Sequence, residues 1–184
     1  NVGPAMTMTS LCTIVKSFLD PDTPVNHGSF EPIEIISPLG TFINAVYPAA
    51  CGGMVEVKTL LDSVGSTAMG QAVPEMKVGD LKGGGNHTYI SGPDPHRNDI
   101  YLLYEWPAGG TGASEGHDGN NGVRNYTEGD FNSVHAVEIV ESQHPIAIDR
   151  FEIRTGSCGD GKWRGGFGIR RDVRLRSETG ALSV

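Results

Sequence analysis

Apolar residues recur at steps of three and four in two stretches of the first 75 residues, and this spacing predicts two amphipathic helices. The first stretch follows Pro4, which suits a first helical turn, and Pro21 ends it. The second contains Gly65 and Gly70, each costing about 1 kcal/mol relative to alanine, so this helix is expected to need packing. The apolar positions are Ala5, Met8, Leu11, Cys12, Val15, Phe18 and Leu19, then Val57, Leu60, Leu61, Val64, Ala68 and Ala72.

Between the two helices the pattern changes to turn-forming residues over positions 20–28, which predicts a loop. A short apolar run at residues 34–36 follows, bounded by Pro32 and Pro38. We expect a strand there.

From Asn86 onward the apolar period is two. Ile100 and Leu102 alternate with Tyr101 and Leu103, which predicts a strand buried on both faces. Further along, alternation over residues 146–153 changes phase near position 149, as a bulge or break would require. Residues 168–176 and 181–184 predict two more strands. The fold class expected is α+β, with early helices followed by a mostly antiparallel β-sheet with long Gly-rich loops.

Composition limits how much core the chain can build alone. Hydrophobic residues make up 38% of 184 positions, and the 26 glycines are about twice the usual share. Glycine raises the entropy lost on folding, so we expect a partner surface to contribute to burial. The helix at Pro4 starts without a preceding cap and the last apolar run stops at Val184, so residues 1–184 are expected to form a single partial domain.

A formal net charge of −8 argues against nucleic acid and anionic membrane as partners. Two interpretations of the local basic stretch stay open: an anion-binding patch, or the solvated face of a strand. Eight of the 14 basic residues lie in it, namely Arg150, Arg154, Lys162, Arg164, Arg170, Arg171, Arg174 and Arg176.

Three cysteines at wide spacings, Cys12, Cys51 and Cys158, favour reduced thiols over a disulfide framework or a zinc ribbon. The start of the chain lacks a signal-peptide pattern, and no apolar run approaches the ~20 residues that span a bilayer. We therefore expect a cytoplasmic protein.

Two glycine-rich segments, residues 109–119 and 156–168, concentrate polar groups. Neither has the spacing of a P-loop or of the dinucleotide fingerprint, so ATP is not expected to bind this chain. Such loops allow close backbone approach and can offer free N–H groups to an oxyanion or a carboxylate.

His117 and Asp118 lie in the first segment, where the histidine could act as a general base; alternatively, Asp118 caps a turn in a surface loop. Glu128, with Asp130 and Asn132, could bind a metal or hold a catalytic cation, or could be ordinary acidic surface. The six histidines show no metal-ligand spacing, so no metal site is expected.

Several motifs, in this order and spacing, resemble those of the hydantoinase B/oxoprolinase family. The resemblance covers roughly Pro4 to Val184 and would make the chain the later portion of a B-type subunit. The motifs are PVNHGSFEPI at residues 24–33, PLGTFIN at 38–44, YPAA at 47–50, GGTGA at 109–113 and GGFG at 165–168.

The resemblance implies an ATP-dependent, multi-subunit enzyme whose relatives include acetone and acetophenone carboxylases and ATP-dependent hydantoinase and lactamase subunits. It implies ATP with Mg on a hydantoinase A-type partner, a small carbonyl substrate, and a divalent metal in the remainder of the B-type subunit. On this basis His117, Asp118 and Glu128 are the expected catalytic residues. The expected substrate-binding residues are Gly109, Gly110, Gly112 and Asn26.

The family's Asn-Thr-Pro-hydrophobic-Glu element is replaced here by residues 130–138, and Glu128-Gly129-Asp130 is similar to the ketone carboxylases. Ketone carboxylation is therefore slightly favoured over ATP-dependent hydrolysis of a cyclic amide such as a hydantoin, 5-oxoproline or a lactam. Another alternative is a structural and assembly module in which the glycine-rich loops and residues 150–176 dock partner subunits while the chemistry lies in the rest of the subunit. A free-standing binding protein is the least favoured.

Overall fold

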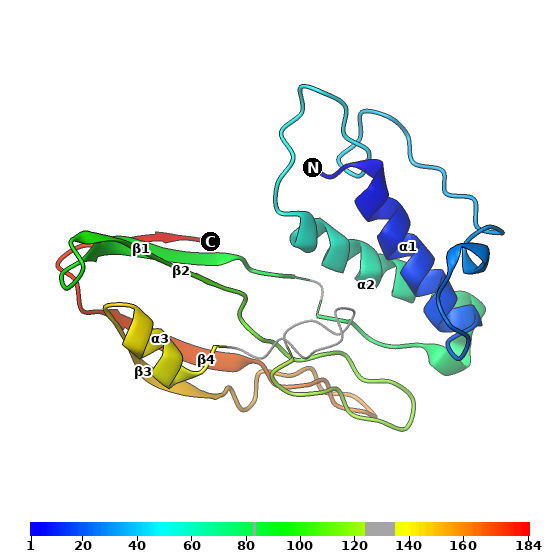
Figure 1. The fold of residues 1–184 in the computed structure, drawn as a ribbon. Coiled ribbons are helices and arrows are strands. Elements are labelled where there is room, and N and C mark those ends of the chain that lie inside the picture. The colour runs from blue at the N-terminus through cyan, green and yellow to red at the C-terminus, as the bar shows by residue number, and fades with distance from the viewer. Residues whose placement is uncertain (83, 124–134) are drawn as a thin grey trace.

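The computed structural model describes residues 1–82, 84–123 and 135–184. Helices come first and antiparallel strands follow, so the expected α+β class is confirmed. In Figure 1 the two long helices gather at one end of the molecule and the strands extend from the other. The elements are α1 (Pro4–Leu19), η1 (His27–Ser29), α2 (Met54–Ala72), η2 (Pro74–Met76), β1 (Thr88–Asp94), β2 (Asp99–Glu105), α3 (Val137–Gln143), β3 (Ile146–Ile153), β4 (Ile169–Leu175) and β5 (Ala181–Ser183).

Both predicted helices are present, and α1 begins at Pro4 as expected. They pack against each other, and the glycine in the middle of α2 lies at their contact. A Cβ atom on Gly65 would stand 3.3 Å from the Cγ2 atom of Ile14. The glycine thus allows the close approach that offsets its low helix propensity.

The strands form two antiparallel sheets, one of three strands in the order β2-β1-β5 and one containing β3 and β4. Their apolar residues meet between the sheets, where Val140 of α3 also packs. The predicted irregularity in β3 is confirmed as a register shift between Ile148 and Arg150. The core residues here are Ile90, Tyr101, Leu103, Val140 and Ile146, with Ile148 and Val173 packed against them.

Two predictions are wrong. Residues 34–36 form no strand, and Ile36 is 85% exposed, because the flanking prolines cannot donate to a ladder and no partner strand lies alongside. Strand β2 is buried on one face only: Tyr101 and Leu103 lie in the core, whereas Ile100 and Leu102 are 76% and 59% exposed.

Candidate functional site

The two glycine-rich segments cross each other at close backbone distance. A Cβ atom on Gly110 would overlap the carbonyl oxygen of Gly166, and one on Gly166 would overlap that of Asn120. A Cβ atom on Gly112 would overlap the amide nitrogen of Asp80. Glycine is required at these positions because no side chain fits between the crossing chains.

The crossing uses several of the N–H groups that the sequence suggested for ligand binding. Gly109 donates to the carbonyl oxygen of Val123 at 2.7 Å, and Gly112 donates to that of Asp80 at 2.5 Å. These two amides therefore serve the fold, contrary to the expectation of free donors. Among the described residues the amide of Gly110 has no such partner. The roles of all three glycines in substrate binding stay predictions.

An open cleft of about 590 Å³ lies over this crossing, and we call it the glycine cleft. Gly110 and Gly112 line it together with the second segment. Arg154 also lines it, and its exposed side chain forms no ion pair within the described part of the chain. A guanidinium at this position can bind phosphate or carboxylate oxygens. The residues with polar side chains that line the glycine cleft are Asp80, Thr111, Arg154, Ser157 and Cys158.

Sequence patterns alone did not single out Arg154 or Cys158 as residues of a site. Arg154 was one of eight basic residues in a stretch, and Cys158 one of three scattered cysteines. The cleft brings them together because residues 154–159 fold back over the glycine crossing. No spacing rule marks such a contact.

His117 and Asp118 do not line the glycine cleft. The carboxylate of Asp118 accepts a hydrogen bond from the backbone N–H of Arg164 at 2.8 Å, and the Arg164 Nε atom lies 3.7 Å from its other oxygen. Asp118 thus joins the two glycine-rich segments. His117 is exposed at a tight turn, exchanging backbone hydrogen bonds with Ser114 at 3.0 and 3.1 Å. Their catalytic roles stay predictions.

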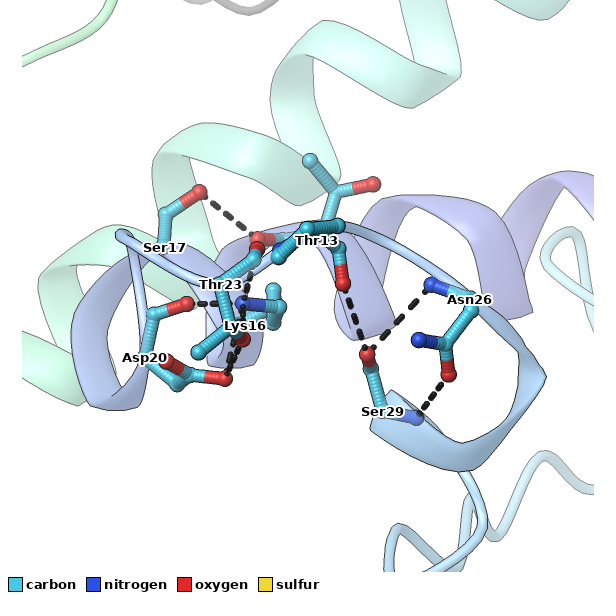
Figure 2. A network of polar contacts seen from close by, with 8 residues as sticks. Thr13, Lys16, Ser17, Asp20, Thr23, Asn26 and Ser29 are labelled. Atoms are coloured by element: carbon cyan, nitrogen blue, oxygen red, sulfur yellow. Dashed lines mark hydrogen bonds and ion pairs between the residues drawn. The ribbon is translucent and has the colours of Figure 1, made fainter.

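Asn26 caps the short helix η1. Its Oδ1 atom accepts from the backbone N–H of Ser29 at 3.3 Å, and the Ser29 hydroxyl accepts from the backbone N–H of Asn26 at 3.4 Å, as Figure 2 shows. In the same network the buried Lys16 donates to the Asp20 carboxylate and the Thr23 hydroxyl, both at 2.8 Å. These contacts hold the loop after α1 in place. The remaining predicted catalytic residue, Glu128, lies outside the described residues.

The basic stretch has two kinds of arginine. Arg170 and Arg174 are exposed and form two-pronged pairs with Asp172 and Asp149, with closest distances of 2.9 and 2.8 Å. These hydrogen bonds lower the pKa of each carboxyl below its usual value. This part of the stretch is therefore a solvated, self-paired strand face.

Arg171 points the other way, into the molecule. Its Nη2 atom lies 3.0 Å from Oε1 of Glu105, and the two side chains are 8% and 9% exposed. The alternation of charges in the sequence gave no sign of this buried pair, because Arg171 stands next to Arg170 in an otherwise polar run.

The sequence pattern of a known family, described as hydantoinase B/oxoprolinase, matches residues 1–184. The chain belongs to the hydantoinase B/oxoprolinase family. An uncharacterized protein of Methanocaldococcus jannaschii is 33% identical to it over 174 residues, which are 94% of this chain and 30% of that protein. A 5-oxoprolinase of Dictyostelium discoideum is 27% identical over 176 residues, which are 95% of this chain and 13% of that protein.

Two solved structures share the fold. A nucleotide-free acetone carboxylase has a TM-score of 0.77 at 19% identity, covering 99% of this chain and 25% of that one. The ATP-dependent caprolactamase of Pseudomonas jessenii has a TM-score of 0.76 at 25% identity, covering 92% and 30%. This hydantoinase B chain thus spans less than a third of the length of these relatives.

Within residues 1–82, 84–123 and 135–184, no group of three or more His, Cys, Asp or Glu side chains could hold a metal ion. The same described residues contain no helix that is long and apolar enough to cross a bilayer. The three cysteines of this hydantoinase B chain are unpaired.

Proposed function

We propose that residues 1–184 are a later portion of the B-type subunit of an ATP-dependent, multi-subunit enzyme that acts on an activated carbonyl group. The match to the hydantoinase B/oxoprolinase family over residues 1–184 carries this proposal. Further support comes from the two related structures, which are named as an enzyme of ATP-dependent acetone carboxylation and an ATP-dependent caprolactamase. Three unpaired cysteines fit a cytoplasmic setting.

In this proposal ATP with Mg binds a hydantoinase A-type partner, because the chain has neither a P-loop nor a dinucleotide fingerprint. The rest of the B-type subunit supplies any divalent metal. The contribution of this chain is the glycine cleft, where the substrate meets the amide of Gly110 and the guanidinium of Arg154.

The chemistry suits a cationic cleft. Transfer of the γ-phosphoryl group of ATP to the oxygen of a ketone that has lost its α-proton, or of an amide, releases ADP and gives a phosphorylated substrate with negative charge on its phosphate oxygens. Arg154 can pair with those oxygens, and a donor at Gly110 can stabilise a neighbouring oxyanion. Both groups bind and orient the substrate; the phosphoryl donor comes from the partner.

Two reactions fit this scheme. Ketone carboxylation is favoured by the similarity of Glu128-Gly129-Asp130 to the ketone carboxylases. Hydrolysis of a cyclic amide is favoured by the names of relatives, which include 5-oxoprolinase and caprolactamase. Incubating the complete enzyme with ATP and bicarbonate plus a ketone, or with ATP plus a lactam, distinguishes them by which mixture consumes ATP. Consumption with neither class would contradict the proposal.

Replacement of Asp118 separates a catalytic role from a positioning role. Asp118→Asn keeps an oxygen that can accept from the Arg164 amide, whereas Asp118→Ala loses it. We expect Asn to retain most of the turnover and Ala to lose at least about tenfold, because the Ala variant loosens the glycine crossing. Equal loss in both variants would instead assign Asp118 to proton transfer, and normal turnover in both would remove it from the site.

The alternative of an assembly module makes a different prediction for the exposed arginines. Charge reversal at Arg170 and Arg174 should dissociate the complex if they dock a partner subunit. Because both are already paired with aspartates of this chain, we expect the complex to stay intact on size-exclusion chromatography. Dissociation would favour the assembly role.

A further inference from the structure

The loop that joins α1 to α2 exposes large apolar side chains over residues 36–47, and we call this group the apolar loop face. The exposed fractions of its five residues run from 49% to 95%. In Figure 1 the loop runs along the outer side of α1, away from the strands. The residues of the apolar loop face are Ile36, Leu39, Phe42, Val46 and Tyr47.

Hydrogen bonds to buried residues hold the backbone of the apolar loop face in one conformation. The backbone N–H of Val2 donates to the carbonyl oxygen of Phe42 at 2.8 Å, and the N–H of Ala45 donates to the carbonyl oxygen of Val2 at 3.0 Å. The hydroxyl of Thr7 donates to the carbonyl oxygen of Ile43 at 2.5 Å. Val2 and Thr7 are both 0% exposed. Side chains on a backbone fixed in this way are in position before a partner surface arrives, which reduces the entropy lost on binding.

The charged residues next to the apolar loop face have one sign. Residues 17–57 contain no lysine or arginine. Asp22, Glu31 and Glu34 are exposed and form no ion pair with any described residue. An apolar surface with acidic neighbours is complementary to an apolar surface edged by lysine or arginine. The same acidic residues disfavour nucleic acid and anionic lipid as the occupant.

We propose that the rest of the same B-type polypeptide covers the apolar loop face, through a surface with an apolar centre and a basic edge. In the relatives this segment is less than a third of one longer polypeptide. A surface joined covalently to this segment has a higher effective concentration than a separate subunit. Side chains as apolar and exposed as these fit a permanent interface, which is the more hydrophobic class. The inference rests on the proposed function only in taking residues 1–184 as part of a B-type subunit.

Photo-crosslinking within the complete enzyme tests which polypeptide lies on the apolar loop face. A p-benzoylphenylalanine in place of Phe42 or of Tyr47 carries the crosslinking group, and mass spectrometry of the digest identifies the peptide that it joins. We expect peptides of the B-type polypeptide outside residues 1–184. On a denaturing gel a link within one polypeptide leaves the subunit size unchanged, whereas a link to a partner or to a second copy raises it. A raised size, or no crosslink, would overturn the proposal.

The matched control carries the same crosslinking group in place of Glu152. Its side chain is 52% exposed and lies on the self-paired charged face of β3 and β4. We expect this position not to capture the peptides found from Phe42 and Tyr47. The same peptides from all three positions would indicate unspecific capture, and this too would overturn the proposal.

A charge placed on the apolar loop face gives a second measurement. Phe42→Asp puts a carboxylate where the covering surface excludes water, so the two surfaces should separate. We expect amide hydrogen exchange over residues 36–47 of the complete enzyme to become at least about tenfold faster. Ile100→Asp is the control, because Ile100 is 76% exposed on β2, and it should leave exchange over residues 36–47 unchanged. Unchanged exchange in Phe42→Asp would contradict a covered face.

The acidic neighbours test the basic edge of the covering surface. Replacing Glu31 and Glu34 together by lysine should make exchange over residues 36–47 at least about threefold faster than replacing both by glutamine, because like charges then meet across the interface. High salt should remove the difference. Equal exchange in the two double variants at low salt would contradict a basic edge.

These outcomes separate the covered face from the proposed reaction. If Phe42 crosslinks to the A-type partner while a ketone or a lactam still stimulates ATP consumption, the proposed function stands and the covering surface has been assigned wrongly. If the crosslinks stay within the B-type polypeptide while neither substrate class stimulates ATP consumption, the covered face stands and the proposed reaction fails.

Discussion

The buried residues of α2 are Thr59, Asp62, Ser66 and Gly70, whereas the buried cluster between the two sheets is apolar, with the Glu105–Arg171 pair as a charged exception beside it. Asp62 is 1% exposed and accepts hydrogen bonds from Ser10 and Lys58. The contact between the helices therefore combines buried hydrogen bonds with a small apolar cluster of Ile14, Phe18 and Leu81, whereas apolar packing dominates between the sheets.

The difference shows that a hydrophobic stripe locates a helix without fixing which face it buries. Met8 and Leu19 of α1 and Leu60 and Val64 of α2 belong to the predicted stripes, yet all four are exposed. Large exposed apolar side chains are available for contact with a partner surface. This fits our expectation that a partner surface completes the fold, which stays a prediction.

The largest expected effect comes from breaking the buried polar contact in which Asp62 accepts hydrogen bonds from Ser10 and Lys58. Lys58→Met removes a cation 2.7 Å from the buried carboxylate of Asp62. Leaving a buried charge without its partner should lower the stability of the helical pair by about 4 kcal/mol. Native-state hydrogen exchange of the α2 amides in the purified subunit measures this loss.

The double variant Lys58→Met, Asp62→Leu is the control for that measurement. Replacing both charges with apolar groups should restore most of the lost stability, since the cost lies in the unpaired carboxylate. A double variant that is as unstable as the single one would show that the stability of the helical pair depends on the ion pair itself.

The apolar interior gives a slightly smaller expected effect. Leu103→Ala leaves a cavity between the sheets and should cost about 3 kcal/mol. Leu102→Ala, on the exposed face of the same strand, should change stability by no more than about 0.5 kcal/mol. Hydrogen exchange in β1 and β2 checks both values, and similar losses in the two variants would contradict the one-sided burial of β2.

The smallest expected effect belongs to the exposed ion pairs. The hydrogen bonds from Arg174 lower the pKa of Asp149 in the folded chain below its unfolded value. The resulting stability is fully present above the unfolded pKa of about 4 and is lost as pH falls through the folded pKa. Arg174→Gln should therefore reduce the fall in melting temperature between pH 7 and pH 3. An unchanged pH dependence would show that the pair adds nothing measurable.

Much of the secondary structure followed from local pattern. Pro4 fixed the start of α1, and the change of phase near residue 149 located the bulge in β3, because both depend on neighbours in the chain. The strand expected at residues 34–36 did not form, since a strand also needs a partner that local pattern cannot supply.

The sequence predicted which segments form the candidate site, but not which of their residues line it. The sequence identified the two glycine-rich segments as unusual and suggested His117 and Asp118 as their catalytic residues. In the structure His117 exchanges backbone hydrogen bonds with Ser114, and Asp118 accepts one from the amide of Arg164. Glycine content alone cannot say whether an N–H group faces a ligand or another backbone. At Gly109 and Gly112 it faces another backbone.

By itself the sequence determined the two long helices, the strands from residue 88 onward and the family motifs, because each depends on residues close together in the chain, but it did not indicate α3. Tertiary structure alone decided which face of each helix is buried, where Arg154 lies and that Arg171 meets Glu105. Arg171 and Glu105, for example, are 66 positions apart, and only the packing of one segment of backbone on another brings them into contact.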